Sequence, residues 1–253
     1  PIFKENHFNL IYPLNDKYDY DLGELRSQKS KFNFTIDRIN QFCIPKNGKA
    51  INFWDFGCRD GALIYSIKNN RIKSFGVEMN ENLIQRSSEI GVGNIFLGNI
   101  ENENSIKELS QKGDFEIIHM NDVLEHLIKP FTFLKVLAGY QKENSYLVLN
   151  QMNIDSLGYK LFGKNWYYIH AQHIYYFSSN SLKKYLENLG YERIYKHEIP
   201  GYKSLFILPK EILKLIKDWR TRTFYKSSYE KIWFAENRPK LFDYSFNIFK
   251  KIK

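Results

Sequence analysis

The chain of 253 residues is poor in cysteine and has no long apolar run. Its two cysteines, Cys43 and Cys58, cannot form the disulfide framework that holds many small secreted domains together. No apolar stretch is long enough to cross a bilayer, and the first residues do not show the pattern of a signal peptide. These absences exclude a disulfide scaffold and favour a reduced, cytoplasmic protein without a transmembrane segment.

The sequence also lacks internal repeats, and its positive charge is not spread evenly. The formal net charge is +9. Residues 1–200 contain 24 Lys and Arg against 23 Asp and Glu, whereas residues 201–253 contain 13 against 5. A protein that grips a long nucleic acid is more often basic around its catalytic cleft as well. Because the excess lies in the last segment, we do not expect a nucleic acid as the partner.

What the chain has is enough apolar sequence for one large α/β domain. Apolar residues make up 43% of the chain and aromatic residues 17%. An amphipathic helix is predicted at 31–43, after an irregular start. Strands and helices then alternate, and the strands are predicted at 51–56, 74–78, 94–97, 115–120, 146–150 and 191–198. Residues 210–253 show apolar residues at helical spacing and are predicted to be helical, basic and aromatic.

The segment 53–61 predicts a ligand site. It reads as a buried strand, a tight turn at Gly57 and a helix start after Gly61, and open α/β sheets bind nucleotide-like ligands at such a turn. Cys58 stands where a dinucleotide fingerprint has its second glycine, and no Lys-Ser or Lys-Thr pair follows, which excludes a phosphate-binding P-loop. Asp55 would repel a pyrophosphate, but it suits a cation such as a sulfonium or an α-amino group.

Three stretches resemble one known family. The segment 53–61 resembles the first motif of the class I S-adenosylmethionine-dependent methyltransferases. Leu124-Glu125-His126 resembles the L-E-H segment after the fourth strand in one branch, and residues 173–178 match its H-x-Y-Y-F-S pattern. That branch includes ubiquinone-pathway O-methyltransferases and many sugar methyltransferases. The resemblance covers roughly residues 50–195.

The resemblance implies the fold and the boundaries of the catalytic domain. We expect a Rossmann-like, doubly wound, mostly parallel seven-stranded sheet with helices on both faces. Residues 1–48 would form an N-terminal cap or lid, and residues 49–200 the cofactor-binding catalytic domain. Within that domain, residues 151–177 would form a substrate insert. Beyond the stretch that the resemblance covers, helical spacing and basic charge predict that residues 201–253 form a helical extension. It would pack on the domain or on a homodimer partner, or it would attract an acidic ligand or a membrane surface.

The resemblance also implies the cofactor, S-adenosyl-L-methionine, and the residues around it. Glu78 lies 21 positions after Gly57, a distance at which an acidic residue reaches the ribose hydroxyls of an adenosine ligand. Asn99 can donate and accept at once, which suits an adenine edge. The alternatives are a solvated glutamate and a turn asparagine. The full predicted cofactor set is Asp55, Gly57, Cys58, Gly61, Glu78, Met79, Asn99, Ile100, Asn121 and Leu124.

The acceptor is expected to meet the aromatic insert. Aromatic rings make flat walls that pack against sugar faces or nucleobases. An alcohol must lose its proton during methyl transfer, and histidine is the side chain whose pKa lies nearest neutral pH. His173 is the first candidate base and His126 the second, although a Glu-His pair near a helix start can simply cap it. The predicted acceptor residues are Asn153, Trp166, Tyr168, His170 and Tyr176.

These predictions lead to one main hypothesis and two alternatives. The main hypothesis is an O-methyltransferase that acts on a hydroxyl of a small polar acceptor, a sugar or nucleotide-linked sugar of a cell-surface polysaccharide pathway, and uses no metal. The first alternative is a metal-assisted phenol or quinone-precursor O-methyltransferase in which the Glu-His pair binds a divalent cation. The second is a non-catalytic protein that keeps the fold for binding.

Overall fold

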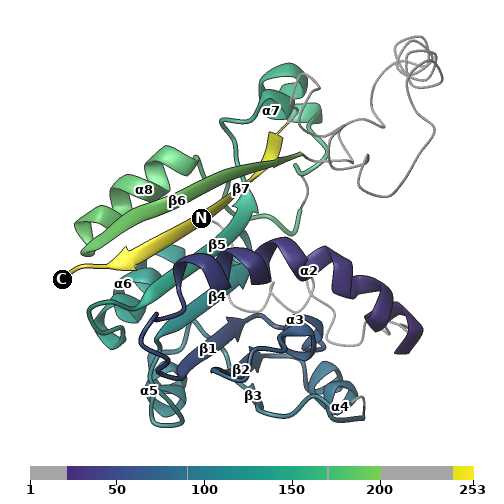
Figure 1. The fold of residues 1–253 in the computed structure, drawn as a ribbon. Helices are drawn as coiled ribbons and strands as arrows, with labels where there is room; N and C mark the ends of the chain where they lie inside the picture. The colour runs from purple at the N-terminus through teal and green to yellow at the C-terminus, as the bar shows by residue number, and fades with distance from the viewer. Residues whose placement is uncertain (1–21, 90, 170, 201–241) are drawn as a thin grey trace.

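A computed structural model describes residues 22–89, 91–169, 171–200 and 242–253. The protein is built around one seven-stranded sheet with strand order β3-β2-β1-β4-β5-β7-β6 (Figure 1). The strands are β1 (Ile51–Phe56), β2 (Ile72–Glu78), β3 (Ile95–Leu97), β4 (Ile117–Asn121), β5 (Tyr146–Met152), β6 (Tyr191–Pro200) and β7 (Phe242–Lys251). The first five strands pair in parallel, whereas β7 is antiparallel to both β5 and β6. The predicted mostly parallel α/β fold is confirmed.

Helices cover both faces of the sheet. The helices are α2 (Leu22–Phe42), α3 (Ala62–Ser66), α4 (Glu81–Glu89), α5 (Glu103–Ser110), α6 (Pro130–Tyr140), α7 (Leu157–Phe162) and α8 (Ser179–Asn188), and 3-10 turns occur at Leu124–His126 and Gly163–Asn165. Side chains of α5, α6 and α8 pack on one face, and those of α2 and α3 pack on the other. In none of the described segments does a helix combine the length and hydrophobicity needed to cross a membrane.

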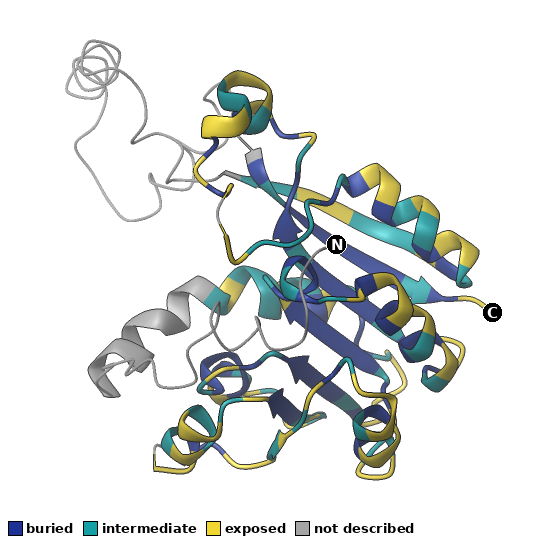
Figure 2. Cartoon of the chain, turned by 180° about the vertical axis from the view of Figure 1, so that it is seen from behind, coloured by how far each residue is buried: buried dark blue, intermediate teal, exposed yellow. Residues whose placement is uncertain are grey.

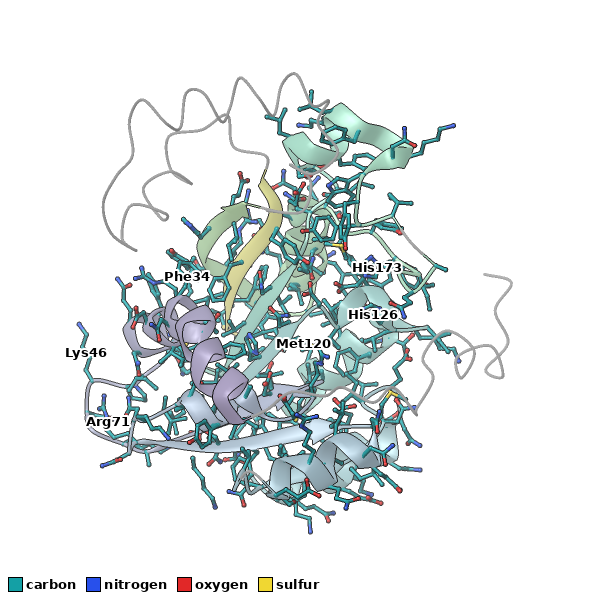
Figure 3. The ribbon with its side chains drawn as sticks, turned by 90° about the vertical axis from the view of Figure 1, so that its right-hand side faces the viewer. Phe34, Lys46, Arg71, Met120, His126 and His173 are labelled. Atoms are coloured by element: carbon teal, nitrogen blue, oxygen red, sulfur yellow. The ribbon has the colours of Figure 1, made fainter. Side chains whose placement is uncertain are left out.

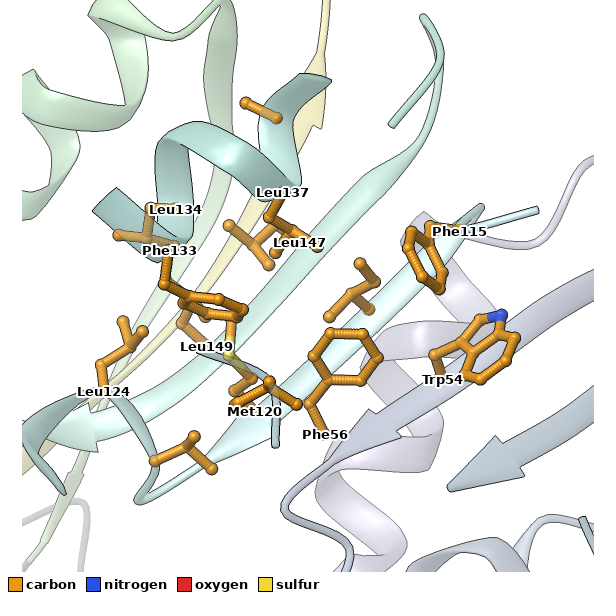
Figure 4. Packing of buried hydrophobic residues seen from close by; sticks show 14 of the residues in the cluster. Trp54, Phe56, Phe115, Met120, Leu124, Phe133, Leu134, Leu137, Leu147 and Leu149 are labelled. Atoms are coloured by element: carbon orange, nitrogen blue, oxygen red, sulfur yellow. The ribbon is translucent and has the colours of Figure 1, made fainter. Parts of the chain in front are cut away.

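The central strands are buried on both sides, as expected for parallel strands between two helix layers (Figure 2). Trp54 of β1 stacks on Phe75 of β2 with ring centroids 4.5 Å apart. On the same face, α6 packs over β4 and β5 (Figure 4). The residues that make this contact include Phe56, Met120, Phe133, Leu134, Leu137, Leu147 and Leu149. This packed centre fixes the strand ends at which the loops begin.

Two sequence predictions need correction. The helix before β1 begins at Leu22, so part of the segment expected to be irregular is helical. Residues 242–251, expected to belong to a helical extension, form strand β7 between β5 and β6. The reason is a two-residue alternation in this stretch, which suits a strand better than a helix. The rest of the predicted extension, residues 201–241, and residues 1–21 of the predicted N-terminal cap lie outside the described residues.

Candidate active site

The glycine turn after β1 has the backbone that the sequence predicted. Gly57 and Gly61 both adopt positive φ, at 73° and 75°. The N–H groups of Gly57 and Cys58 donate to the carbonyl of Val77 on β2. A Cβ on Gly61 would lie 2.7 Å from Ile95 and 2.8 Å from Val92. A side chain at position 61 would therefore clash with Val92 and Ile95, and the positive φ also favours glycine there.

Cys58 contributes its backbone to the turn. Its side chain is buried with Ile64 and Val92, and burial raises the pKa of the thiol well above its ordinary value. A protonated, enclosed thiol is not a nucleophile. Gly76 on β2 provides the space, since a Cβ there would lie 2.6 Å from the Cys58 sulfur.

Glu78, at the carboxyl end of β2, closes the turn from the other side. Its Oε2 accepts a hydrogen bond from the Arg59 N–H at 2.9 Å. Its Oε1 accepts from the N–H groups of Met79 and Asn80, at 2.8 and 3.0 Å. A carboxylate has about four acceptor positions, and three are occupied here. The side chain is buried and held by these three bonds, which leaves one acceptor position on Oε2.

Asp55 lies two residues before the turn and has a partner that the sequence did not predict. Its Oδ1 and the Nδ1 of His119 on β4 are 2.7 Å apart. The two residues are opposite each other in the β1–β4 register, and both are buried. No donor among the described residues reaches the other carboxylate oxygen of Asp55. That oxygen can accept from a cationic ligand group.

The remaining predicted cofactor residues fall into two groups. Leu124 and Ile100 are buried in the core beneath the strand ends. Met79, Asn99 and Asn121 are exposed at the carboxyl edge. Asn99 uses its side-chain oxygen to accept from the Glu101 N–H, as the turn alternative predicts. The Asn121 oxygen accepts from the Asn150 amide at 2.5 Å.

The insert after β5 docks onto the turn that follows β4. The N–H groups of Ile174 and Tyr175 both donate to the backbone carbonyl of Glu125. Nδ1 of His126 lies 3.0 Å from the carbonyl of Gln172. These contacts bring two segments that are far apart in the sequence into one wall.

The wall contains both candidate bases. The rings of His126 and His173 have centroids 4.9 Å apart, and Tyr176 packs edge-on against His173 (Figure 3). Nδ1 of His173 lies 2.8 Å from the carbonyl of Tyr168. A backbone carbonyl can only accept, so each imidazole carries a proton on Nδ1 and directs Nε2 elsewhere. His170, the third predicted histidine, lies outside the described residues.

Three of the predicted acceptor residues support the loop. The Trp166 ring is buried, and its Nε1–H donates to Asp243 of β7 at 2.7 Å. The side-chain oxygen of Asn153 accepts from the N–H groups of Asp155 and Ser179. Tyr168 is also buried, against the rings of Trp166 and Tyr244. Their contribution to an acceptor would be to shape the loop that presents His173 and Tyr176.

A pair of acidic side chains lies beneath the two histidines. Glu125 is only 1% exposed. Neither of its carboxylate oxygens has a hydrogen-bond donor among the described residues, and the same holds for Oδ1 of Asp122. Burial, and then the charge of Asp122, raise the pKa of Glu125 well above its ordinary value. Burial likewise raises the pKa of Asp122. The Oδ2 of Asp122 accepts from the Asn121 amide, so the acceptors left over are the two Glu125 oxygens and Oδ1 of Asp122, which can share a proton or take up a cation.

The same place has the donor set of a metal site. Among the described residues, Glu125, His126 and His173 each offer a ligand atom, and these atoms lie within 4.8 Å of one another. Imidazoles whose Nδ1 faces a carbonyl are typical of metal-binding histidines. Two imidazoles and a carboxylate suit a first-row divalent cation. The residues therefore fit a metal as well as a proton.

Sequence reasoning missed four polar residues of this region: His119, Asp122, Asp243 and Tyr244. Asp122 is next to the L-E-H segment and has a positive φ of 52°, which no pattern in the sequence indicates. Asp243 and Tyr244 belong to the strand that was expected to be helical. The signal for them was the alternation of polar and aromatic residues from 242 to 248.

Comparison with known proteins identifies the family. A family model described as a methyltransferase domain matches residues 27–196, which is more than half of the chain. The chain belongs to this methyltransferase family. No curated protein matches the sequence.

Solved structures confirm the fold. A SAM-dependent methyltransferase from Archaeoglobus fulgidus is 21% identical with a TM-score of 0.56, and the match covers 91% of this chain and 100% of that one. Magnesium protoporphyrin IX methyltransferase from Synechocystis PCC 6803, solved with bound SAH, is 12% identical with a TM-score of 0.54, covering 98% and 96%. A possible histamine N-methyltransferase from Thermotoga maritima is 14% identical with a TM-score of 0.54, covering 95% and 99%.

The protein is thus an S-adenosylmethionine-dependent methyltransferase, and the predicted enzyme class and cofactor are confirmed. The neighbours differ in what their names say they methylate. The acceptor therefore has to be inferred from the site.

Proposed function

We propose that this methyltransferase transfers a methyl group to a hydroxyl of a small polar acceptor, with His173 as the general base. The acceptor class that we propose is a sugar or nucleotide-linked sugar of a cell-surface polysaccharide pathway. The observation that carries the proposal is the wall formed by His126, His173 and Tyr176, which docks over the turn after β4. It supplies proton acceptors and an aromatic surface in one place.

The cofactor residues have distinct roles in this proposal. S-adenosylmethionine supplies an electrophilic methyl group on a sulfonium. Glu78 accepts from a ribose hydroxyl at its remaining position, and Asp55 accepts from the α-ammonium group. Asn99 meets the adenine edge with its amide group. In-line methyl transfer needs little covalent help from the protein, so positioning supplies most of the rate.

His173 suits the role of base because of its tautomer. With the proton on Nδ1 held by the Tyr168 carbonyl, the lone pair lies on Nε2. The hydroxyl oxygen would form a bond to the methyl carbon as the sulfur–methyl bond breaks and S-adenosylhomocysteine leaves. Nε2 would take the hydroxyl proton, and the ring would become an imidazolium. The carboxylate of the Asp122–Glu125 pair lies near enough to stabilise this charge. His126, held in the same way by Gln172, is the second candidate.

Two features support a small polar acceptor. The wall is aromatic, and Tyr167 and Ile169 on the insert are 45% and 37% exposed, so apolar and ring surface faces outward beside the histidines. Rings of this kind pack against sugar faces. Residues 1–200 carry nearly equal numbers of basic and acidic residues, which does not favour a polyanion as the acceptor.

The test is a mass-shift screen of sugars and sugar nucleotides with enzyme and S-adenosylmethionine, followed by His173→Ala on the acceptor found. We expect turnover to fall by roughly 10²- to 10⁴-fold with cofactor affinity near normal. A control variant, Tyr167→Phe, keeps the ring and should retain activity. Turnover within about threefold of wild type in His173→Ala would show that His173 is not the base.

A second candidate is favoured by the cluster of Glu125, His126 and His173. It is a metal-assisted O-methyltransferase acting on a phenol or quinone precursor. A divalent cation in this cluster would hold the acceptor oxygen and lower the pKa of its hydroxyl. Glu125 would supply a negatively charged carboxylate ligand. The carbonyls of Tyr168 and Gln172 would orient the imidazoles of His173 and His126. His173 would then be a ligand, so the two candidates exclude each other.

The two candidates are separated by removing metal. Enzyme dialysed against EDTA is assayed with and without added Mg²⁺ or Mn²⁺. Unchanged turnover supports the base mechanism. Turnover that is lost, is restored by either cation, and is not restored in Glu125→Gln supports the metal mechanism, because the glutamine amide is a poor cation ligand.

A further inference from the structure

Asp55 and His119 form a buried pair on an otherwise apolar face of the sheet. Asp55 is 5% exposed and His119 is 3% exposed, and their ring-to-carboxylate distance is 2.7 Å. They lie side by side on the neighbouring parallel strands β1 and β4 (Figure 1). Their surroundings on this face are apolar, and include Phe53, Ile117 and Val148. A buried acid–base pair in such a place is often replaceable by apolar residues without loss of stability.

The imidazole also has an unsatisfied atom. Nε2 of His119 is buried and has no hydrogen-bond partner among the described residues. The ring is held on one side by Phe53, with which it stacks at 6.1 Å. A buried polar atom without a partner works against folding. A histidine kept only for stability would not be expected to carry this cost, which points to a role in function.

The position of the pair indicates the function. Asp55 precedes Gly57 by two residues, and His119 precedes Asn121 by two, so both lie just below the carboxyl edge where the cofactor loops begin. His119 engages only Oδ1 of Asp55, and Oδ2 has no donor from the described residues. A carboxylate fixed at one oxygen has a defined rotamer, and its other oxygen is presented in one direction.

We propose that His119 is a positioning residue for the cofactor: it holds Asp55 so that Oδ2 accepts from the α-ammonium group of S-adenosylmethionine. The inference rests on the cofactor role of Asp55 proposed above. On this proposal, His119 affects the binding of ligands that carry the amino-acid end of S-adenosylmethionine. It does not affect the binding of ligands that lack this end. Adenosine recognition belongs to Glu78 and Asn99 and does not involve His119.

The test uses two ligands of the full-length enzyme, measured by calorimetry. S-adenosylhomocysteine has the amino-acid end, and 5′-methylthioadenosine lacks it. In His119→Leu we expect about tenfold weaker binding of S-adenosylhomocysteine and binding of 5′-methylthioadenosine within about twofold of wild type. In His119→Asn the amide nitrogen occupies the place of Nδ1 and donates to Asp55, so affinity should return to within about threefold of wild type.

The control variants keep the inference falsifiable. His119→Gln is polar but places its amide beyond the position of Nδ1, so it should behave like His119→Leu and replaces it if that variant does not fold. Equal weakening of both ligands, or no weakening of S-adenosylhomocysteine, would overturn the inference. Asp55→Asn separates the role of His119 from the cofactor role of Asp55. If Asp55→Asn weakens the binding of S-adenosylhomocysteine and His119→Leu does not, only the role of His119 fails. If neither variant has an effect, the cofactor role of Asp55 fails as well.

Discussion

The two halves of the sheet build their sites in different ways. On the β3-β2-β1-β4 side, the proposed cofactor residues lie within a few positions of a strand end and contact neighbouring turns and strands. Glu78 accepts from the amides of Arg59, Met79 and Asn80, and Asp55 pairs with His119. On the β5-β7-β6 side, the acceptor wall depends on partners far along the chain, as in the bond from Trp166 to Asp243. One half is assembled by local strand–turn–helix units, and the other by a strand from the end of the chain.

Because of this difference, mutations in the two halves should have different effects. A change in the local half should alter cofactor binding and leave the acceptor wall in place. A change in the distant half should alter the wall and its stability and leave cofactor binding in place. The three predictions below test that separation, beginning with the largest effect.

The largest effect is expected for Glu78→Ala. The variant loses a charge-assisted contact to the ribose and also the acceptor that holds three amides of the turn. Charge-assisted hydrogen bonds contribute about 1.5–3 kcal/mol, so S-adenosylhomocysteine affinity should fall by up to about 100-fold in calorimetry. Glu89→Ala, at the exposed end of α4, is the matched control and should bind normally. A comparable rise in the KM for the acceptor at saturating cofactor would contradict the separation between the cofactor half and the acceptor half.

The next effect is expected for Gly158→Ala on the other side. A Cβ at this position in α7 would lie 1.9 Å from Oδ1 of Asp243, the atom that accepts from Trp166. The aspartate cannot move without losing that bond, so we expect the free energy of unfolding to fall by about 2–3 kcal/mol in urea titration. Turnover should fall as well, because the displaced loop carries His173, whereas cofactor affinity should be retained.

The matched control for this change is Gly139→Ala. Gly139 lies in α6, and nothing comes within 4 Å of a Cβ placed there. Alanine is the better helix former, so stability should rise by up to about 1 kcal/mol. If both variants change stability by the same amount, the contact between α7 and Asp243 is not what holds the acceptor wall.

The comparison also explains what the sequence could predict. The turn at Gly57 and the position of Glu78 at the end of a strand follow from local patterns, because each residue acts within its own strand–turn–helix unit. The mostly parallel seven-stranded sheet was an implication of the family resemblance. The family resemblance added His126 and His173, and the structure places them together. Their distance could not be predicted, since it depends on how residues 166–177 fold back over Glu125.

The C-terminal strand shows where local patterns mislead. Phe242, Tyr244, Phe246 and Ile248 alternate with polar residues, as in a strand, but the basic and aromatic composition before them favours a helix. The polar residues Asp243, Ser245 and Asn247 are themselves buried, and the last two bond to each other and to Ser179 of α8. A strand with a buried polar face is specified by its partners, which a single sequence does not show.

The smallest effect is expected at the junction of the two halves, in the pH dependence of stability of Glu125→Gln. Burial raises the pKa of Glu125, so the folded protein binds more protons than the unfolded chain above pH ~4.3, the ordinary value for glutamate. Stability of the wild type should therefore fall as pH rises from about 5 to 8. Glutamine does not titrate and can donate to Asp122 in place of the shared proton.

The measurement is the free energy of unfolding at several pH values in EDTA, which keeps any divalent cation out of the cluster. Glu125→Gln should gain stability relative to the wild type as the pH rises across this range, because only the wild-type carboxyl group has to lose its proton there. Tyr176→Phe, which changes the same wall without altering a group that ionises below about pH 8, should show no such trend. A wild type and a Glu125→Gln variant with parallel pH profiles would mean that the pair holds no extra proton, and the orphaned oxygens would then require a cation.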